Sequence, residues 1–159
     1  MKKIIICIFV ICINHQAFSK PPRPIFQRMK VKVNNIIIDV EVADTLEEQS
    51  YGLMYIEKPL KENQGMLFVY DYAKPLTFWM KNTFIPLSIG FFDKNKKLIN
   101  IEEMQSSSLL QMNYDTAKSQ GLAQYALEMN IGWFKKNNVQ PGHRLEFFNS
   151  NKGLKSSSP

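Results

Sequence analysis

The chain has 159 residues, a formal net charge of +6 and only two cysteines, Cys7 and Cys12. This length suits a single domain with a hydrophobic core of its own. The positive charge is concentrated at one end: residues 20–32 hold five basic side chains and no acid, while everything from Val33 onward sums to −1. A nucleic-acid-binding domain would carry its basic residues on the folded part, so we predict no nucleic-acid partner.

Residues 1–19 have the layout of a secretory signal peptide. Lys2 and Lys3 precede an apolar run over 4–13, and Ala17-Phe18-Ser19 offers small residues for cleavage. The apolar run is about half as long as a membrane-spanning helix, and no later segment is apolar enough to span. We therefore predict an exported protein, periplasmic or secreted, without a transmembrane segment after cleavage. Both cysteines would leave with the signal, so the mature chain would be cysteine-free and could hold neither a disulfide nor a thiolate metal site.

The segments on either side of the predicted domain have biased compositions. Residues 20–32 are basic and contain three prolines. We predict a flexible extended leader there, which could make weak contact with anionic lipid or polysaccharide surfaces or serve as a solvated linker. Residues 149–159 are rich in Ser, Lys and Asn, a composition that predicts a disordered tail.

Residues 33–148 are predicted to form one mainly β domain, because apolar and polar residues alternate over many short segments. The predicted strands cover residues 31–33, 36–42, 66–70, 76–81, 87–92, 97–103, 124–129 and 144–148. Strands of this number and length, with two short helices, indicate a β-sandwich or a barrel.

The connections between these strands carry their own signals. Asn34-Asn35 predicts a hairpin turn between the first two strands. Thr45-Leu46-Glu47-Glu48 fits the capping box of a first helix that should end near Gly52. A second short helix is predicted over 131–137. Residues 105–120 are polar and aperiodic, which predicts a long surface loop.

Several motifs in this domain occur together in one known family. They are Val42-Ala43-Asp44-Thr45, Gly52-Leu53-Met54, Gly65-Met66-Leu67-Phe68, the run Phe78 to Leu87, and Tyr125-Ala126-Leu127-Glu128 with Gly132 and Pro141-Gly142. With these motifs in this order, the chain resembles domain-of-unknown-function family 192 over roughly residues 33–148. The resemblance implies a compact jelly-roll-like β domain, commonly exported by bacteria, with no established activity.

Two positions depart from the family's usual pattern. The family usually has an aspartate where this chain has Ser88, and another where it has His143. A mechanism that relied on those acids would need a carboxylate from elsewhere in this chain.

The run Phe78–Leu87 holds the candidate binding site. On a strand, Trp79 and Lys81 would share the face opposite to the core, and Asn82 and Thr83 would follow at the strand end. An aromatic ring, a cation, an amide and a hydroxyl together suit carbohydrate or anion recognition.

A purely structural interpretation competes with this one. Trp79 would then fill the core, the next polar residues would tie a tight connection, and Lys81 would either extend its ammonium group to solvent or pair with an acid such as Asp71 or Asp93.

Metal and cofactor chemistry has less support. Met54, Met66 and Met80 could hold Cu(I), a soft ion that thioethers bind, although methionines in apolar strands usually fill gaps in the core. We otherwise predict no metal site and no cofactor. The sequence contains none of the common nucleotide-binding, metalloprotease or serine-hydrolase motifs.

Two functions therefore remain open. The first is a non-enzymatic envelope domain that binds a small molecule, a glycan or a protein near Phe78–Leu87. The second is a hydrolase or lyase in which Lys81 acts with a carboxylate partner. A fully solvated Lys81 with no acid in reach would exclude the enzyme, and a wholly buried Trp79 would remove the anchor of the binding site.

Overall fold

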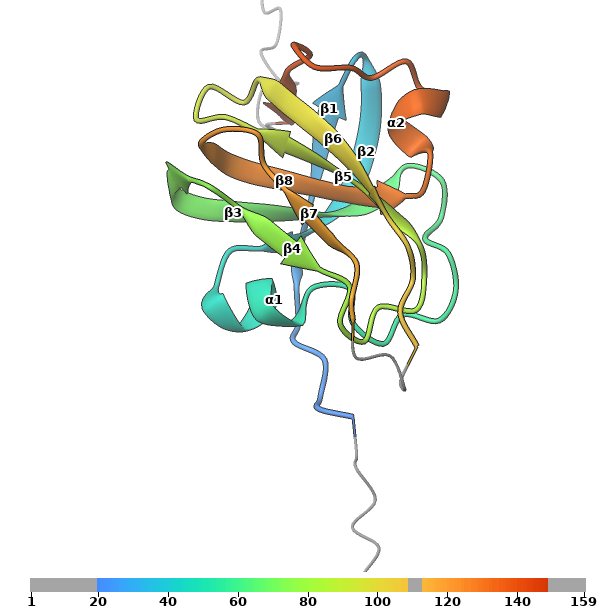
Figure 1. The fold of residues 1–159 in the computed structure, drawn as a ribbon. Coiled ribbons are helices and arrows are strands. Elements are labelled where there is room, and N and C mark those ends of the chain that lie inside the picture. The colour runs from blue at the N-terminus through green and yellow to red at the C-terminus, as the bar shows by residue number, and fades with distance from the viewer. Residues whose placement is uncertain (1–19, 109–112, 149–159) are drawn as a thin grey trace, which may run out of the picture.

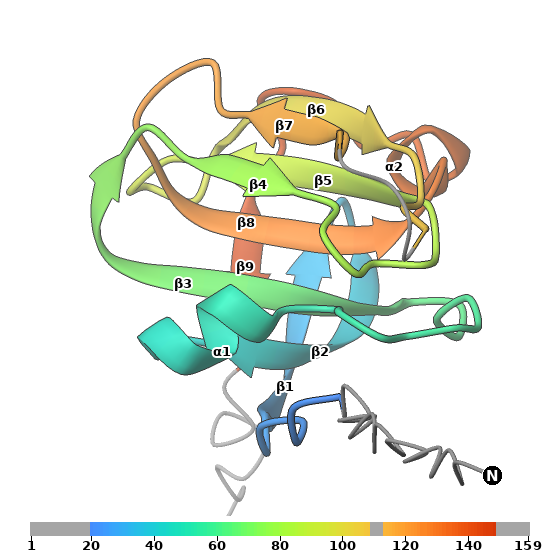
Figure 2. The same cartoon turned by 60° about the horizontal axis from the view of Figure 1, so that its bottom comes forward.

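The structure is a computed structural model and describes residues 20–108 and 113–148. The predicted signal peptide and the predicted disordered tail lie outside the described residues. One curled seven-stranded sheet forms a half-barrel, and a two-stranded sheet covers part of one face (Figure 1, Figure 2). The prediction of a mainly β domain with two short helices is confirmed. Strands β2 and β3 pair in parallel, so the main sheet is mixed, whereas a jelly roll pairs two antiparallel sheets.

The elements follow one another closely along the chain. The strands are β1 (Gln27–Val33), β2 (Ile36–Ala43), β3 (Gln64–Lys74), β4 (Thr77–Trp79), β5 (Leu87–Phe92), β6 (Leu98–Met104), β7 (Thr116–Lys118), β8 (Ala123–Asn130) and β9 (Leu145–Phe147). The helices are α1 (Leu46–Tyr51) and α2 (Trp133–Lys136). The main sheet has the order β6-β5-β8-β3-β2-β1-β9, so β8 lies between β5 and β3, and β4 pairs with β7 in the small sheet.

The two local motifs that the sequence predicted most directly are confirmed. Asn34 and Asn35 have φ of +47° and +66°, the left-handed conformation that a tight β1–β2 hairpin needs. Thr45 caps α1: its Oγ1 accepts from the Glu48 N–H at 3.3 Å, and Glu48 Oε2 accepts from the Thr45 N–H at 3.1 Å. The helix ends at Gly52, whose φ is +51°.

The first strand begins earlier than predicted. Residues 27–32, assigned to the flexible leader, form most of β1 and pair with β2. Val31 is fully buried, while Arg28 donates to Asp39 Oδ2 at 2.8 Å on the outer side of the sheet. The leader prediction was wrong here because the density of basic residues concealed a strand that alternates charged and apolar positions.

The predicted 105–120 loop also contains a strand. Ala117 in β7 pairs with Phe78 in β4 and is buried. The loop is tied down further where Ser107 N–H donates to the Thr83 carbonyl at 2.8 Å. Three residues with a single apolar member give too short a pattern to reveal a strand from sequence.

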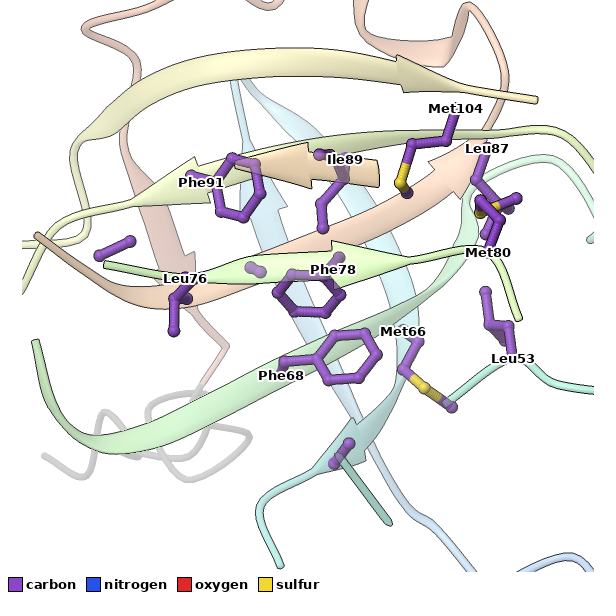
Figure 3. Packing of buried hydrophobic residues seen from close by; sticks show 14 of the residues in the cluster. Leu53, Met66, Phe68, Leu76, Phe78, Met80, Leu87, Ile89, Phe91 and Met104 are labelled. Atoms are coloured by element: carbon purple, nitrogen blue, oxygen red, sulfur yellow. The ribbon is translucent and has the colours of Figure 1, made fainter. Parts of the chain in front are cut away.

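Buried side chains form two clusters, one on each face of the main sheet. The first fills the space between the main sheet and the β4–β7 pair. There the Phe78 ring lies between Phe68 and Phe91, with ring centroids 4.8 and 5.8 Å away (Figure 3). This cluster attaches the small sheet to the half-barrel and so fixes the strand that carries Trp79. No helix among the described residues has the length and apolar character needed to cross a membrane.

Candidate functional site

The strand that carries the candidate site alternates as predicted. Phe78 and Met80 are 9% and 1% exposed, whereas Trp79 is 54% exposed. Lys81 lies on the same side as Trp79, with its Nζ 5.2 Å from the centroid of the indole ring, a cation–π contact. The Tyr114 ring meets the same indole edge-to-face at 6.4 Å. Trp79 is therefore available to a ligand and is not part of the core.

Asn82 and Thr83 hold the connection after β4. Asn82 has a left-handed φ of +54° and donates from Nδ2 to the Tyr55 hydroxyl at 3.0 Å. Thr83 is buried, its Oγ1 donates to the Lys81 carbonyl at 3.3 Å, and its carbonyl accepts from Ser107. These bonds are those of the structural interpretation, and a ligand-binding role for Asn82 and Thr83 stays a prediction.

A narrow cleft of about 30 Å³ lies beside Trp79. One wall is the segment 49–54, which comprises the end of α1 and the turn after it. The other lining residues are Phe68, Phe78, Trp79, Lys81, Thr83 and Glu128. The cleft thus brings together three of the four predicted site residues and adds an acid that the sequence did not single out. Asn82 is outside the lining.

Glu128 is the unexpected member of the cleft. It lies on the central strand β8, paired with Met66 on β3 and Ile89 on β5, and is only 5% exposed. No described residue forms a hydrogen bond or an ion pair with its carboxyl group. In the described residues every side-chain N or O that is fully buried has a hydrogen-bond partner. The carboxyl oxygens of Glu128 have none, so they must reach the open space of the cleft.

The surroundings of Glu128 keep it protonated. Burial raises the pKa of its carboxyl group to about 8, because an apolar environment disfavours the charged form. On the same face, burial and then the charge of Glu128 raise the pKa of Tyr70 to about 12. At neutral pH the cleft therefore contains a carboxylic acid, which can donate one hydrogen bond and accept others.

Lys81 does not make the ion pair that was one of two alternatives in the structural interpretation. Within residues 20–108 and 113–148 no carboxylate oxygen lies within 4.0 Å of its Nζ, and both Asp71 and Asp93 are among those residues. Asp93 instead accepts backbone N–H bonds from Asn95 and Lys97 in its own turn. The half-buried Lys81 ammonium is left beside the indole ring, in the lining of the cleft.

One of the two positions that depart from the family pattern, Ser88, lies on the other face of the sheet. Ser88 alternates with Leu87 and Ile89, whose side chains face the first cluster. Its hydroxyl donates to Glu103 Oε1 at 2.7 Å and accepts from the Gly132 N–H at 2.7 Å. An acid at this position would not reach Lys81, so the departure leaves the cleft unaffected.

The methionines proposed for Cu(I) are divided between core and cleft. Met66 and Met80 are buried in the first cluster (Figure 3), and the half-buried Met54 lines the cleft. Among the residues that the structure describes, no three His, Cys, Asp or Glu side chains gather as metal ligands would. A Cu(I) site on these thioethers stays a prediction.

Comparisons with known proteins agree with this fold. The family model described as "Uncharacterized ACR, COG1430", DUF192, matches residues 29–147. The chain belongs to the DUF192 family. The match begins inside β1 and ends with the last residue of β9, so it extends from the first to the last strand of the main sheet along the chain.

Two solved structures resemble this DUF192 domain. One is a "putative transcription regulator" from Sinorhizobium meliloti 1021, with a TM-score of 0.67, 28% identity, and 77% of this chain and 95% of that one covered. The other is a protein of unknown function from Novosphingobium aromaticivorans DSM 12444, with a TM-score of 0.67, 29% identity, and coverage of 76% and 86%. No curated protein matches the chain. The relatives support the fold, and the chemistry of the cleft is what bears on function.

Proposed function

We propose that this DUF192 protein is an exported, non-enzymatic domain that binds a saccharide unit of the cell envelope in the cleft between Trp79 and Glu128. The observation that carries the proposal is the Glu128 carboxyl group, which is buried in the centre of the sheet, has no partner among the described residues and opens into the cleft. An unpaired polar group in an apolar site costs free energy, and a ligand that hydrogen-bonds to it removes that cost.

The shape of the cleft supports a ring outside and a small group inside. A volume of about 30 Å³ admits one small substituent but not a sugar ring. The exposed Trp79 indole supplies a flat apolar face on which a ring can lie, and Lys81 beside it supplies a cation for an anionic or hydroxyl substituent. Aromatic side chains with a few convergent polar groups are the usual composition of small-molecule sites.

Catalysis by Lys81 with a carboxylate partner is the second candidate, since Lys81 and Glu128 line the same cleft. Binding is favoured because a general acid must reach the bond that it cleaves, and the narrow cleft keeps a sugar ring away from Glu128. The part of the proposal that places the protein outside the cytoplasm is supported by the signal-like segment 1–19. The charge balance from Val33 onward continues to argue against a nucleic-acid partner.

The proposal is tested by titrating the chain from residue 20 onward with fragments of envelope glycans in a calorimeter. We expect binding of at least one oligosaccharide, and a loss of about fivefold or more in affinity for Trp79→Ala, since aromatic stacking contributes on the order of 1 kcal/mol or more. Tyr72→Ala is the matched control, because Tyr72 is another exposed aromatic residue and does not line the cleft. Absence of binding to every fragment, or equal losses in the two variants, would contradict the proposal. Product formation from any fragment would favour the enzyme instead.

A further inference from the structure

We propose that Glu128 selects ligands that carry an acetamido group, so that the saccharide bound in the cleft is an N-acetylated amino sugar. This inference rests on the proposed function, since it specifies the ligand of the same cleft. It goes beyond that function by assigning the selecting contact to one side chain and one chemical group.

The hydrogen-bonding capacity of Glu128 matches an amide. A protonated carboxyl group donates from its O–H, and the carbonyl oxygen of a secondary amide is a good acceptor for that bond. In the planar trans amide of an acetamido group the C=O and the N–H point in opposite directions, so the amide meets Glu128 through its carbonyl oxygen, which accepts from the acid O–H. No described residue occupies either side of that acid.

The walls of the cleft suit the rest of the acetamido group. Phe68 and Phe78 contribute aromatic carbon, and Leu53 and Met54 contribute aliphatic carbon and a thioether. A methyl group placed among these side chains is removed from water, and its burial leaves no polar atom without a hydrogen-bond partner. A bare hydroxyl has no methyl group and would fill less of this apolar lining.

A free amine fits the cleft less well. An ammonium group would need an ionised Glu128, whose neighbours along the sheet, Met66 and Ile89, cannot stabilise a charge. It would also meet the positive charge of Lys81, which lines the same cleft. The N-acetylated form of the sugar removes both penalties.

The protonation of Glu128 gives the selection a pH limit. The ionisable side chains that line the cleft with it are Tyr51 of α1 and Lys81. Tyr70 of β3 lies close enough for the charge of Glu128 to raise its pKa, and the β5 residue paired with Glu128 is the apolar Ile89. Because the pKa of Glu128 is about 8, the acid form that an amide needs disappears above that pH. Affinity for an acetamido ligand should then fall, by about thirtyfold between pH 6.5 and pH 9.5 if only the acid form binds.

The experiment compares three disaccharides by calorimetry: N,N′-diacetylchitobiose, its de-acetylated counterpart chitobiose, and cellobiose, which carries hydroxyls instead. We expect the diacetylated sugar to bind at least tenfold more tightly than the other two, and to lose that advantage at pH 9.5. Glu128→Gln should keep the preference and abolish its pH dependence, because a glutamine side chain also offers a donor and an acceptor but does not titrate. Glu128→Leu, of similar size and suited to an apolar site, should lose the preference.

The outcomes separate the two proposals. Equal affinities for the three sugars, or a preference retained by a folded Glu128→Leu variant, would overturn the inference and leave saccharide binding intact. A preference lost in Glu128→Gln would show that a hydrogen bond donated from residue 128 to the amide carbonyl does not select the ligand, which also overturns the inference. Failure of all three sugars and of the other envelope glycans would overturn both proposals.

Discussion

Glu128 should make the domain less stable as the pH rises. The ordinary pKa of a glutamate carboxyl group is 4.5, and burial raises that of Glu128 to about 8 in the folded protein. Below the lower pKa both the folded and the unfolded chain hold the proton, so the burial of Glu128 carries no ionic cost. Between the two values the unfolded chain releases the proton and the folded chain keeps it, which favours unfolding increasingly with pH. Above the folded pKa the cost stays constant.

The size of the effect follows from the width of this interval. Each pH unit contributes about 1.4 kcal/mol, so the interval from the pKa of the unfolded chain to pH 7 costs the folded state about 3 kcal/mol. Glu128→Gln keeps the shape of the side chain and removes the titration. The difference in the free energy of unfolding between this variant and the wild type should therefore grow by about 3 kcal/mol from pH 4 to pH 7, a large part of the stability of a single domain.

Urea unfolding followed by circular dichroism at pH 4, 5.5, 7 and 8.5 measures this difference. Glu62→Gln is the control, because Glu62 is an exposed acid whose pKa is lowered by its bond to Lys136. Its contribution has the opposite sign, since a lowered pKa stabilises the folded state above the unfolded pKa and is lost on acidification. A free-energy difference for Glu128→Gln that does not change with pH would refute the reasoning that Glu128 is held protonated in the fold.

Three further substitutions test the fold by the same urea assay. Gly65→Ala should cost about 2 kcal/mol or more, because the added Cβ would lie 2.4 Å from the backbone carbonyl oxygen of Glu128; Gly121→Ala, whose Cβ would meet only ordinary contacts at 3.8 Å, should have little effect, and equal losses would contradict this. Thr45→Ala should cost about 1 kcal/mol through loss of the α1 cap, and an unchanged stability would show that the cap is dispensable. Ser88→Ala should cost about 1 kcal/mol, since it removes two hydrogen bonds in a buried position, and a neutral result would mean that water replaces the hydroxyl.

The elements that the sequence predicted well are those with a local cause. The asparagine turn, the Thr45 capping box and the alternation through Phe78–Lys81 each need only a few adjacent residues to form. The strand β7 depends on β4, a partner far along the chain, and has too few residues to indicate a strand. The start of β1 pairs within the neighbouring hairpin, but its own residues are too basic to indicate a strand.

The candidate site divides in the same way. Trp79 and Lys81 could be placed on one outward face because that requires only the two-residue period of a strand. Glu128 could not be joined to them, because the cleft forms only when α1, β3, β4 and β8 come together. One signal was available: Glu128 is the single charged residue in the otherwise uncharged β8, at a position that shares a face with Ala126. A charged residue inside a strand that reads as buried is a reason to look for a site.

The two sides of the cleft differ in how the backbone holds them. Glu128 belongs to a strand with hydrogen-bonded neighbours on both sides, whereas in the described parts of the chain the ladders of β4 and β7 join these two strands only to each other. Amide hydrogens of β8 should thus exchange with solvent only when the whole domain opens, while those of the β4–β7 pair should exchange through smaller, more frequent openings. The protein would then hold the carboxyl group of Glu128 rigidly, while the strand that carries the Trp79 ring above it moves more readily. This mobility would let the ring adjust to ligands of different shapes that all make the same contact with Glu128.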